Sequence, residues 1–383
     1  MQAVSINPPA ENVFVDKIVF NHFMFQTIFD NLTPLEFLRL ARTCRVARAV
    51  VQRFIEQTFT TKINQILSRF FTDPVAFRSL QACTGTLISG SVALQFFDRT
   101  FYPGSDLDLY IPPQSDRHVL QWFPQNGYRF APTSAQPKDL EEAIDQGRVH
   151  GFPNDIFHEE EEDYWSMGTK YIKGVYTFIK PSLVENAPDL QVQCIVTENA
   201  PLDVVLSFHS TCVMNVISYE KAYCLYPRAT LHDHHTVIND LPPSSSQPAA
   251  LSKYKERGFT ICNDIRCDEA VVDISFRLWN RSIGDSLCWS IPLDMEGVGP
   301  GYLLPGKHQP LSHDPVSISQ WRLIPSTTHL RFYKETYTHP FLYFTYVISR
   351  EAVMNDPRAA CDRWWDYEPG YGDEHFINLY GKH

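Results

Sequence analysis

Several features of membrane, secreted or disulfide-bonded proteins are missing from this sequence of 383 residues. No apolar run approaches the roughly 20 residues that a membrane-spanning helix needs, so no membrane segment is predicted. The opening MQAVSINPPAENV lacks the basic and then apolar pattern of a secretory signal. We therefore expect an intracellular protein, either cytoplasmic or nuclear. The nine cysteines are scattered without a Cys-x-x-Cys, which argues against a disulfide framework or a four-cysteine zinc site.

Basic residues are fewer than acidic ones, with 33 Lys and Arg against 44 Asp and Glu, so the formal net charge is -11. A protein that covers nucleic acid usually has a basic surface, so broad nucleic-acid binding is disfavoured, although a small basic groove remains compatible with the sequence. No Walker-type phosphate loop and no Gly-x-Ser-x-Gly motif occurs. Hydrophobic residues make up 44% and aromatic residues 13% of the chain, which is enough apolar material for a folded core.

The hydrophobic periodicity changes along the chain and predicts an α+β protein with a mixed sheet. A helical period gives way to short alternating segments near residue 81, and these mix with further helices. Among the predicted strands are Lys173 to Ile179 and Gln191 to Val196, and among the predicted helices are Asp139 to Asp145, Leu202 to Ser218 and Ala249 to Arg257. The predicted regions are a tail (1–14), a helical unit (15–80), a mixed core (81–235), a linker (236–250) and an irregular C-terminal extension (251–383).

The residues best suited to chemistry lie between positions 87 and 111, in the segments ISGS and GSDLD. Asp106 and Asp108 are two apart on a predicted strand, so both carboxylates face the same side. Their mutual repulsion would be relieved by a divalent cation, and Mg²⁺ prefers such oxygen ligands. Gly90 and Ser91 form a turn into a predicted helix, where backbone N–H groups and a hydroxyl can bind a phosphate.

This ordered pattern, ISGSVALQFF…YPGSDLDLYI, resembles the signature of the nucleotidyltransferase superfamily. DNA polymerase beta, poly(A) polymerases and aminoglycoside nucleotidyltransferases share that fold. The resemblance covers about residues 85–218. It implies a nucleotidyltransferase-like sheet, nucleotide binding at Gly90, Ser91 and Ser105, and one or two Mg²⁺ ions on Asp106 and Asp108 as catalytic residues.

The same resemblance implies a third carboxylate on a later strand, but the matching position is Gln193, or Gln191 if the register shifts. An amide cannot act as a base, and Asp189 lies too far along the strand to replace it. Two functions therefore remain open. One is Mg²⁺-dependent nucleotidyl transfer from a nucleoside triphosphate to an unknown acceptor, and the other is a degenerate domain that binds without catalysis. Lys170 and Lys173 are candidate triphosphate contacts.

The helical region contains a second resemblance, in the segment FQTIFDNLTPLEFLRLARTCR. Thr33-Pro34-x-Glu36 is a typical helix start, with a capping threonine and a glutamate three residues later. Residues 23–45 resemble an F-box, the helical motif that binds the Skp-type adaptor of cullin ubiquitin ligases. The alternative is a helical hairpin with no partner. An F-box-like segment joined to a nucleotidyltransferase-like domain resembles the layout of a group of fungal proteins.

Overall fold

The described part of the chain forms two compact units, Met1–Thr58 and Phe59–His383. The predicted boundary between the helical unit and the mixed core, at residues 80 and 81, stays a prediction. The predicted tail at 1–14 lies outside the described residues. The computed structural model describes residues 17, 21–150, 171–182, 188–239, 247–262, 275–276, 278–299, 314–325, 330–340, 342–348, 373, 376, 377 and 380.

The first unit contains three helices, α1 (His22–Asp30), α2 (Pro34–Ala41) and α3 (Arg45–Ile55). The predicted start of α2 is confirmed. The Thr33 hydroxyl accepts a bond from the Glu36 N–H at 3.4 Å, and the Glu36 carboxylate accepts one from the Thr33 N–H at 2.7 Å. Buried phenylalanine rings from all three helices pack together 4.4 to 6.2 Å apart and form the core of this unit: Phe25, Phe29, Phe37 and Phe54.

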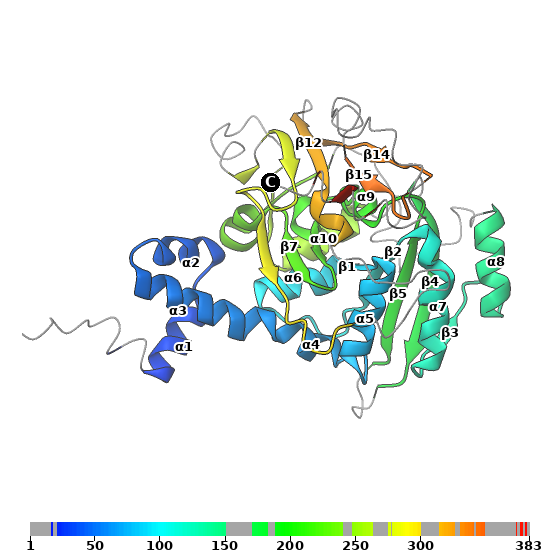
Figure 1. Cartoon of the computed structure of the whole chain (residues 1–383), viewed down its shortest axis with the longest axis horizontal. Helices are drawn as coiled ribbons and strands as arrows, with labels where there is room; N and C mark the ends of the chain where they lie inside the picture. Colours follow the sequence, from blue (N-terminus) through cyan, green and yellow to red (C-terminus); the bar gives the residue numbers. More distant parts are fainter. Residues whose placement is uncertain are drawn as a thin grey trace, which may run out of the picture. The chain divides into compact units, whose positions relative to one another are not determined.

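The second unit is built on a mixed sheet of eight strands in the order β11-β7-β6-β1-β2-β5-β4-β3. The central pair β2 and β5 is parallel, whereas the other neighbours are antiparallel. The predicted α+β class is therefore confirmed (Figure 1). The strands are β1 (Leu87–Ser89), β2 (Leu107–Ile111), β3 (Arg129–Ala131), β4 (Ile172–Lys180), β5 (Leu190–Thr197), β6 (Asn215–Ile217), β7 (Lys221–Cys224) and β11 (Trp289–Pro292).

The helices of the second unit include α6, which connects β1 to β2, and α10, which follows the predicted linker. Their bounds are α4 (Lys62–Leu67), α5 (Pro74–Thr84), α6 (Gly90–Asp98), α7 (Asp116–Gln125), α8 (Leu140–His150), α9 (Pro201–Val205) and α10 (Gln247–Glu256). The single helix predicted from Leu202 to Ser218 was wrong. After α9 ends, the chain makes a short 3-10 turn and then enters β6, which pairs with β1 and β7. Pairing inside a buried sheet outweighs local helical periodicity here.

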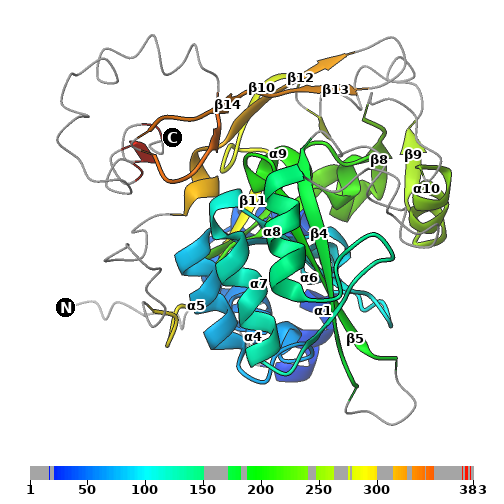
Figure 2. The same ribbon diagram turned by 90° about the vertical axis from the view of Figure 1, so that its right-hand side faces the viewer.

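The C-terminal region contributes to the second unit through several strands among its described residues. β11 extends the large sheet beside β7. Three strands form a separate sheet that lies across one end of the unit in Figure 2: β10 (Trp279–Ser282), β12 (Gln320–Pro325) and β13 (Leu330–Tyr333). Two further pairs are β8 (His235–Val237) with β9 (Thr260–Cys262), and β14 (Thr336–Tyr337) with β15 (Tyr346–Val347). Trp321, Leu323 and Val347 share one buried core with Leu87 of β1.

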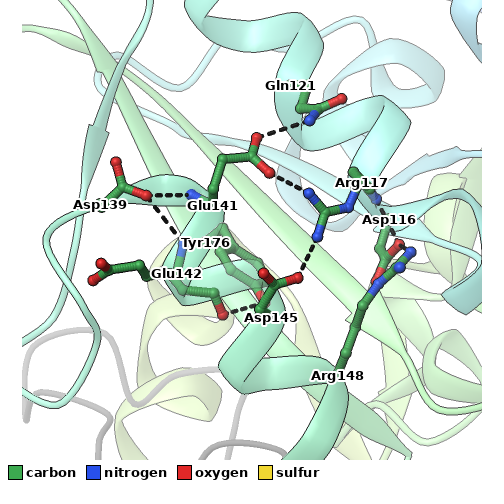
Figure 3. Close-up of polar contacts among 10 residues, drawn as sticks. Asp116, Arg117, Gln121, Asp139, Glu141, Glu142, Asp145, Arg148 and Tyr176 are labelled. Atoms are coloured by element: carbon green, nitrogen blue, oxygen red, sulfur yellow. Dashed lines mark hydrogen bonds and ion pairs between the residues drawn. The ribbon is translucent and has the colours of Figure 1, made fainter.

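Helix α8 is attached to α7 by charged side chains (Figure 3). Arg117 of α7 forms ion pairs with Glu141 and Asp145 of α8, and Arg148 of α8 pairs with Asp116 of α7. The Asp116 side chain is only 4% exposed, whereas both partners of Arg117 are at least 47% exposed. Because solvent screens exposed pairs, the buried Asp116 pair has the larger effect on the position of α8.

Candidate functional site

The turn between β1 and α6 is shaped around one carboxylate. Gly90 has a φ of +66°, a conformation that glycine adopts without steric cost. A Cβ atom at this position would lie 2.1 Å from Oδ2 of Asp108, so no other residue fits without a shift. The backbone N–H of Ser91 donates a hydrogen bond to the Asp108 carboxylate. The Gly-Ser turn and the second aspartate, which are far apart in the predicted motif, are therefore in direct contact.

Asp106 and Asp108 lie at the start of β2 and face the same side of the strand. Burial and the negative charge of Asp106 together raise the pKa of Asp108 to about 8, although the positive charge of Lys253 acts in the opposite direction. A pKa raised this far indicates that the positive charge around the buried carboxylate is too small to stabilise its ionised form. A cation between the two aspartates would supply that charge.

The position predicted for a third carboxylate lies beside Asp108. Strand β5 runs parallel to β2, and the register places Gln193 opposite Asp108. Gln191 is next to Asp106, and its side-chain N–H donates to Asp106 Oδ2 at 3.3 Å. Asp189 precedes β5 and lies two residues before Gln191. The register therefore brings an amide, and not a carboxylate, to the two aspartates.

These donors fit one divalent ion better than two. Asp106 and Asp108 offer carboxylate oxygens, and the amide oxygen of Gln193 is a further neutral donor, so one Mg²⁺ could complete its shell with water or phosphate oxygens. Two-ion sites need additional bridging oxygens. Within the described ranges, no group of three or more His, Cys, Asp or Glu residues is placed to hold a metal. Of the one or two ions that the resemblance implies, these donors fit one.

Positive side chains near this site come from the region of α10, which lies far outside the predicted motif in the sequence. The positive charge of Lys253 lowers the pKa of Asp108, and burial together with Lys253 lowers the pKa of His209 to about 4. Arg257 directly follows the last residue of α10, and its guanidinium lies 3.9 Å from the ring centre of Tyr102. Nη1 of Arg257 is buried and has no hydrogen-bond acceptor among the described residues. In the sequence, the four-residue spacing of Lys253 and Arg257 could have indicated this, because it places both side chains on the same face of a helix.

The sequence instead proposed Lys170 and Lys173 as triphosphate contacts. Lys170 lies outside the described residues. Lys173 sits at a register irregularity of β4, and Thr177, four residues further along, is the residue opposite Gln193. Four residues along a strand correspond to about 13 Å. Lys173 is therefore remote from the two aspartates, whereas Lys253 is close enough for its charge to act on Asp108.

Ser105 holds the loop before β2 in place. Its hydroxyl donates to the Tyr102 carbonyl oxygen at 3.0 Å and accepts bonds from Gln95 Nε2 at 3.0 Å and Arg69 Nη1 at 3.4 Å. A second nitrogen of Arg69 donates to the Ser105 carbonyl oxygen at 3.1 Å. These bonds give Ser105 a structural role, and its contact with a nucleotide stays a prediction.

Comparison of the chain with models of known protein families, with curated proteins and with solved structures finds no match. The resemblances to nucleotidyltransferases and to the F-box therefore rest on the residues described above. None of the helices in the described ranges has the length and apolar character required to cross a membrane.

Proposed function

We propose that this protein binds a nucleoside triphosphate together with Mg²⁺ at Asp106, Asp108 and the Gly90-Ser91 turn. The observation that carries the proposal is the contact between Gly90 and Asp108. The turn that would bind the phosphates and the carboxylate that would bind the metal form one structure, with no room for a side chain between them. A metal-bound triphosphate needs these two groups side by side.

The surroundings supply charge for a polyanion. The start of α6 is the positive end of a helix dipole, which favours a phosphate. Lys253 of α10 and Arg257, which directly follows that helix, add positive charge, and Arg69 adds it beside Asp106. This local cluster is compatible with a net charge of -11, since it needs only a few side chains.

Nucleotidyl transfer would extend this proposal, but the amide at Gln193 argues against it. Transfer would form a bond from an acceptor oxygen to the α-phosphorus and break the bond to pyrophosphate, and the acceptor would lose a proton. Gln193 cannot accept that proton. We therefore propose nucleotide binding as the main function, with any transfer slow because the acceptor proton must leave to water.

Calorimetric titration of ATP with Mg²⁺ tests the proposal. We expect the double variant Asp106→Asn/Asp108→Asn to bind on the order of tenfold to hundredfold more weakly than wild type. We also expect wild-type affinity to fall when Mg²⁺ is removed. The double variant Asp30→Asn/Asp139→Asn removes two exposed carboxylates elsewhere and serves as the control. Equal binding by both double variants, or binding that ignores Mg²⁺, would rule the site out.

A second proposed function is binding of a Skp-type adaptor through residues 23–45. The supporting observation is that the first unit buries four phenylalanine rings yet leaves other large apolar side chains on its surface. Phe23 is 76% exposed and Leu38 is 53% exposed. Met24 and Val46 are exposed as well. Exposed apolar groups on a unit with a complete core are typical of a protein interface.

Binding of a purified Skp-type adaptor to the full chain tests this second proposal. Phe23→Glu/Leu38→Glu should weaken binding by at least about tenfold, because each change places a charge on the apolar surface. Phe101→Glu, at an exposed phenylalanine of the second unit, is the matched control. Absence of binding by wild type, or equal binding by all three proteins, would exclude the adaptor role.

A further inference from the structure

The loop that leads from α6 to Asp106 and β2 exposes an aromatic ring. Phe101 is 67% exposed, although it lies only five residues before Asp106. Exposure of a phenylalanine costs free energy because its apolar surface stays in water. A single exposed apolar residue is common on proteins, so its surroundings must indicate whether it has a role.

The loop that carries Phe101 is held at several points. The Tyr102 N–H donates to the Gln95 side-chain oxygen at 2.7 Å. Nε2 of Gln95 donates to the Ser105 hydroxyl, and that hydroxyl donates to the Tyr102 carbonyl oxygen. Gln95 itself is buried in α6. The Phe101 ring is therefore presented on an anchored loop, which reduces the entropy that a stacking ligand would have to remove.

Arg69 links this ring to the candidate site. Its guanidinium carbon lies 5.2 Å from the centre of the Phe101 ring and 5.0 Å from that of Phe70. The same guanidinium donates two hydrogen bonds to Ser105, the residue directly before Asp106. One cation thus packs on the Phe101 ring and fixes the backbone beside a proposed metal ligand. Most of the ring surface stays open for a planar group.

We propose that Phe101 stacks against the aromatic base of the nucleotide whose phosphates bind at Gly90 and Ser91. This inference rests on the proposed nucleotide-binding function and adds a residue that lies outside the motif. Stacking uses the face of a base, which all bases have, so Phe101 contributes affinity with little discrimination among bases. The base belongs either to the triphosphate or to a nucleotide acceptor, and the two sources are separable by experiment.

Titration of three ligands in the presence of Mg²⁺ tests the inference: ATP, inorganic tripolyphosphate and a short oligoadenylate. Phe101→Ala should weaken binding of ATP about tenfold and leave tripolyphosphate unchanged, because only ATP carries a base. Phe101→Tyr should restore wild-type affinity, since a tyrosine ring also stacks. Tyr333→Ala removes an exposed aromatic ring from β13, away from the proposed site, and should change neither affinity. A loss confined to oligoadenylate would support stacking on the acceptor base.

Failure of the stacking role and failure of the proposed nucleotide binding give different results in these titrations. Unchanged binding of both ATP and oligoadenylate by Phe101→Ala would overturn the stacking role and leave the metal and phosphate site intact. An equal loss for ATP and tripolyphosphate would also overturn it, because the ring would then act on the phosphates. If wild type binds neither ATP nor tripolyphosphate, the proposed function and this inference both fall.

Discussion

At the scale of single residues, Gly90 is the position where the fold and the proposed site depend most directly on one another. Gly90→Ala would place a methyl group 2.1 Å from Asp108 Oδ2 and would force alanine into a left-handed conformation. We expect unfolding free energy to fall by about 2 to 4 kcal/mol, from strain and displacement together. ATP binding in the presence of Mg²⁺ should fall as well, because Asp108 has to move. Urea unfolding and calorimetry measure the two effects.

Gly104→Ala is the matched control for this prediction. Gly104 has a similar φ of +73°, but a Cβ there would have no neighbour within 4 Å. This variant should show only the conformational cost, about 1 kcal/mol or slightly more, and should keep its ATP affinity. If the two variants behave alike, the contact between Gly90 and Asp108 has no special importance.

Single residues also show which contacts could be predicted from the sequence and which could not. The bonds between Thr33 and Glu36 were predictable because both residues belong to one helical turn. The pairing of Gly90 with Asp108 was expected only through the resemblance of the whole pattern. Lys253 was missed because it follows Asp108 by more than a hundred residues, and no local pattern reports such a contact. Tertiary placement decides which lysine lies near a carboxylate.

At the scale of secondary structure elements, the register of β5 against β2 makes a specific prediction. Gln193→Asp places a carboxylate beside Asp108, whereas Gln191→Asp places one beside Asp106. We expect Gln193→Asp to raise Mg²⁺ affinity by roughly tenfold, because a third carboxylate adds charge at the metal position. Without Mg²⁺ the variant should be less stable than wild type, since three carboxylates repel one another.

Thermal unfolding with and without Mg²⁺ checks this prediction, and Gln191→Asp is its companion. The larger Mg²⁺-dependent stabilisation should belong to Gln193→Asp. A larger effect at Gln191 would place the metal nearer Asp106 than proposed. If neither variant responds to Mg²⁺, the paired aspartates do not form a metal site.

Elements were predicted well where the local pattern and the tertiary structure agree. The strands β4 and β5 and the helix α10 lie within a few residues of their predicted positions. The segment after α9 was mispredicted because Val216 and Ile217, which continue a helical pattern, are buried in the sheet as part of β6. Helix α8 was predicted, but its attachment through Arg117 and Arg148 required knowledge of where α7 lies (Figure 3).

At the scale of the whole molecule, the C-terminal region is part of the second unit and not a separate appendage. The sequence described this region only as irregular, because its strands are short and their partners are distant. Strand β11 pairs with β7, and Arg281 of β10 donates to the Leu225 carbonyl oxygen at 2.9 Å beside the Tyr226 ring. These contacts lead us to expect the large sheet and the described C-terminal strands to unfold together.

Asp314 gives this cooperative unit a predictable dependence on pH. Its buried carboxylate accepts bonds from the Tyr223 hydroxyl of β7 at 3.1 Å and from the Val316 N–H at 3.1 Å. Burial and, to a smaller extent, the negative charge of Glu220 raise its pKa from 3.8 to about 6. Between these values the folded protein binds a proton that the unfolded chain releases. Stability should therefore fall as pH rises from about 4 to 6, by at most about 3 kcal/mol from this group.

Urea unfolding between pH 4 and 7 tests this prediction by comparison of wild type with Asp314→Asn. The amide cannot ionise and still offers an oxygen to Tyr223, so the variant should lack this part of the pH dependence. The free-energy difference between the two proteins should grow in favour of the variant as pH rises and level off above about pH 6. The same charge change at exposed Asp139 controls for net charge. A difference that is constant across this range would mean that Asp314 is already ionised in the folded protein at pH 4, and that water or a neighbouring cation compensates for its burial.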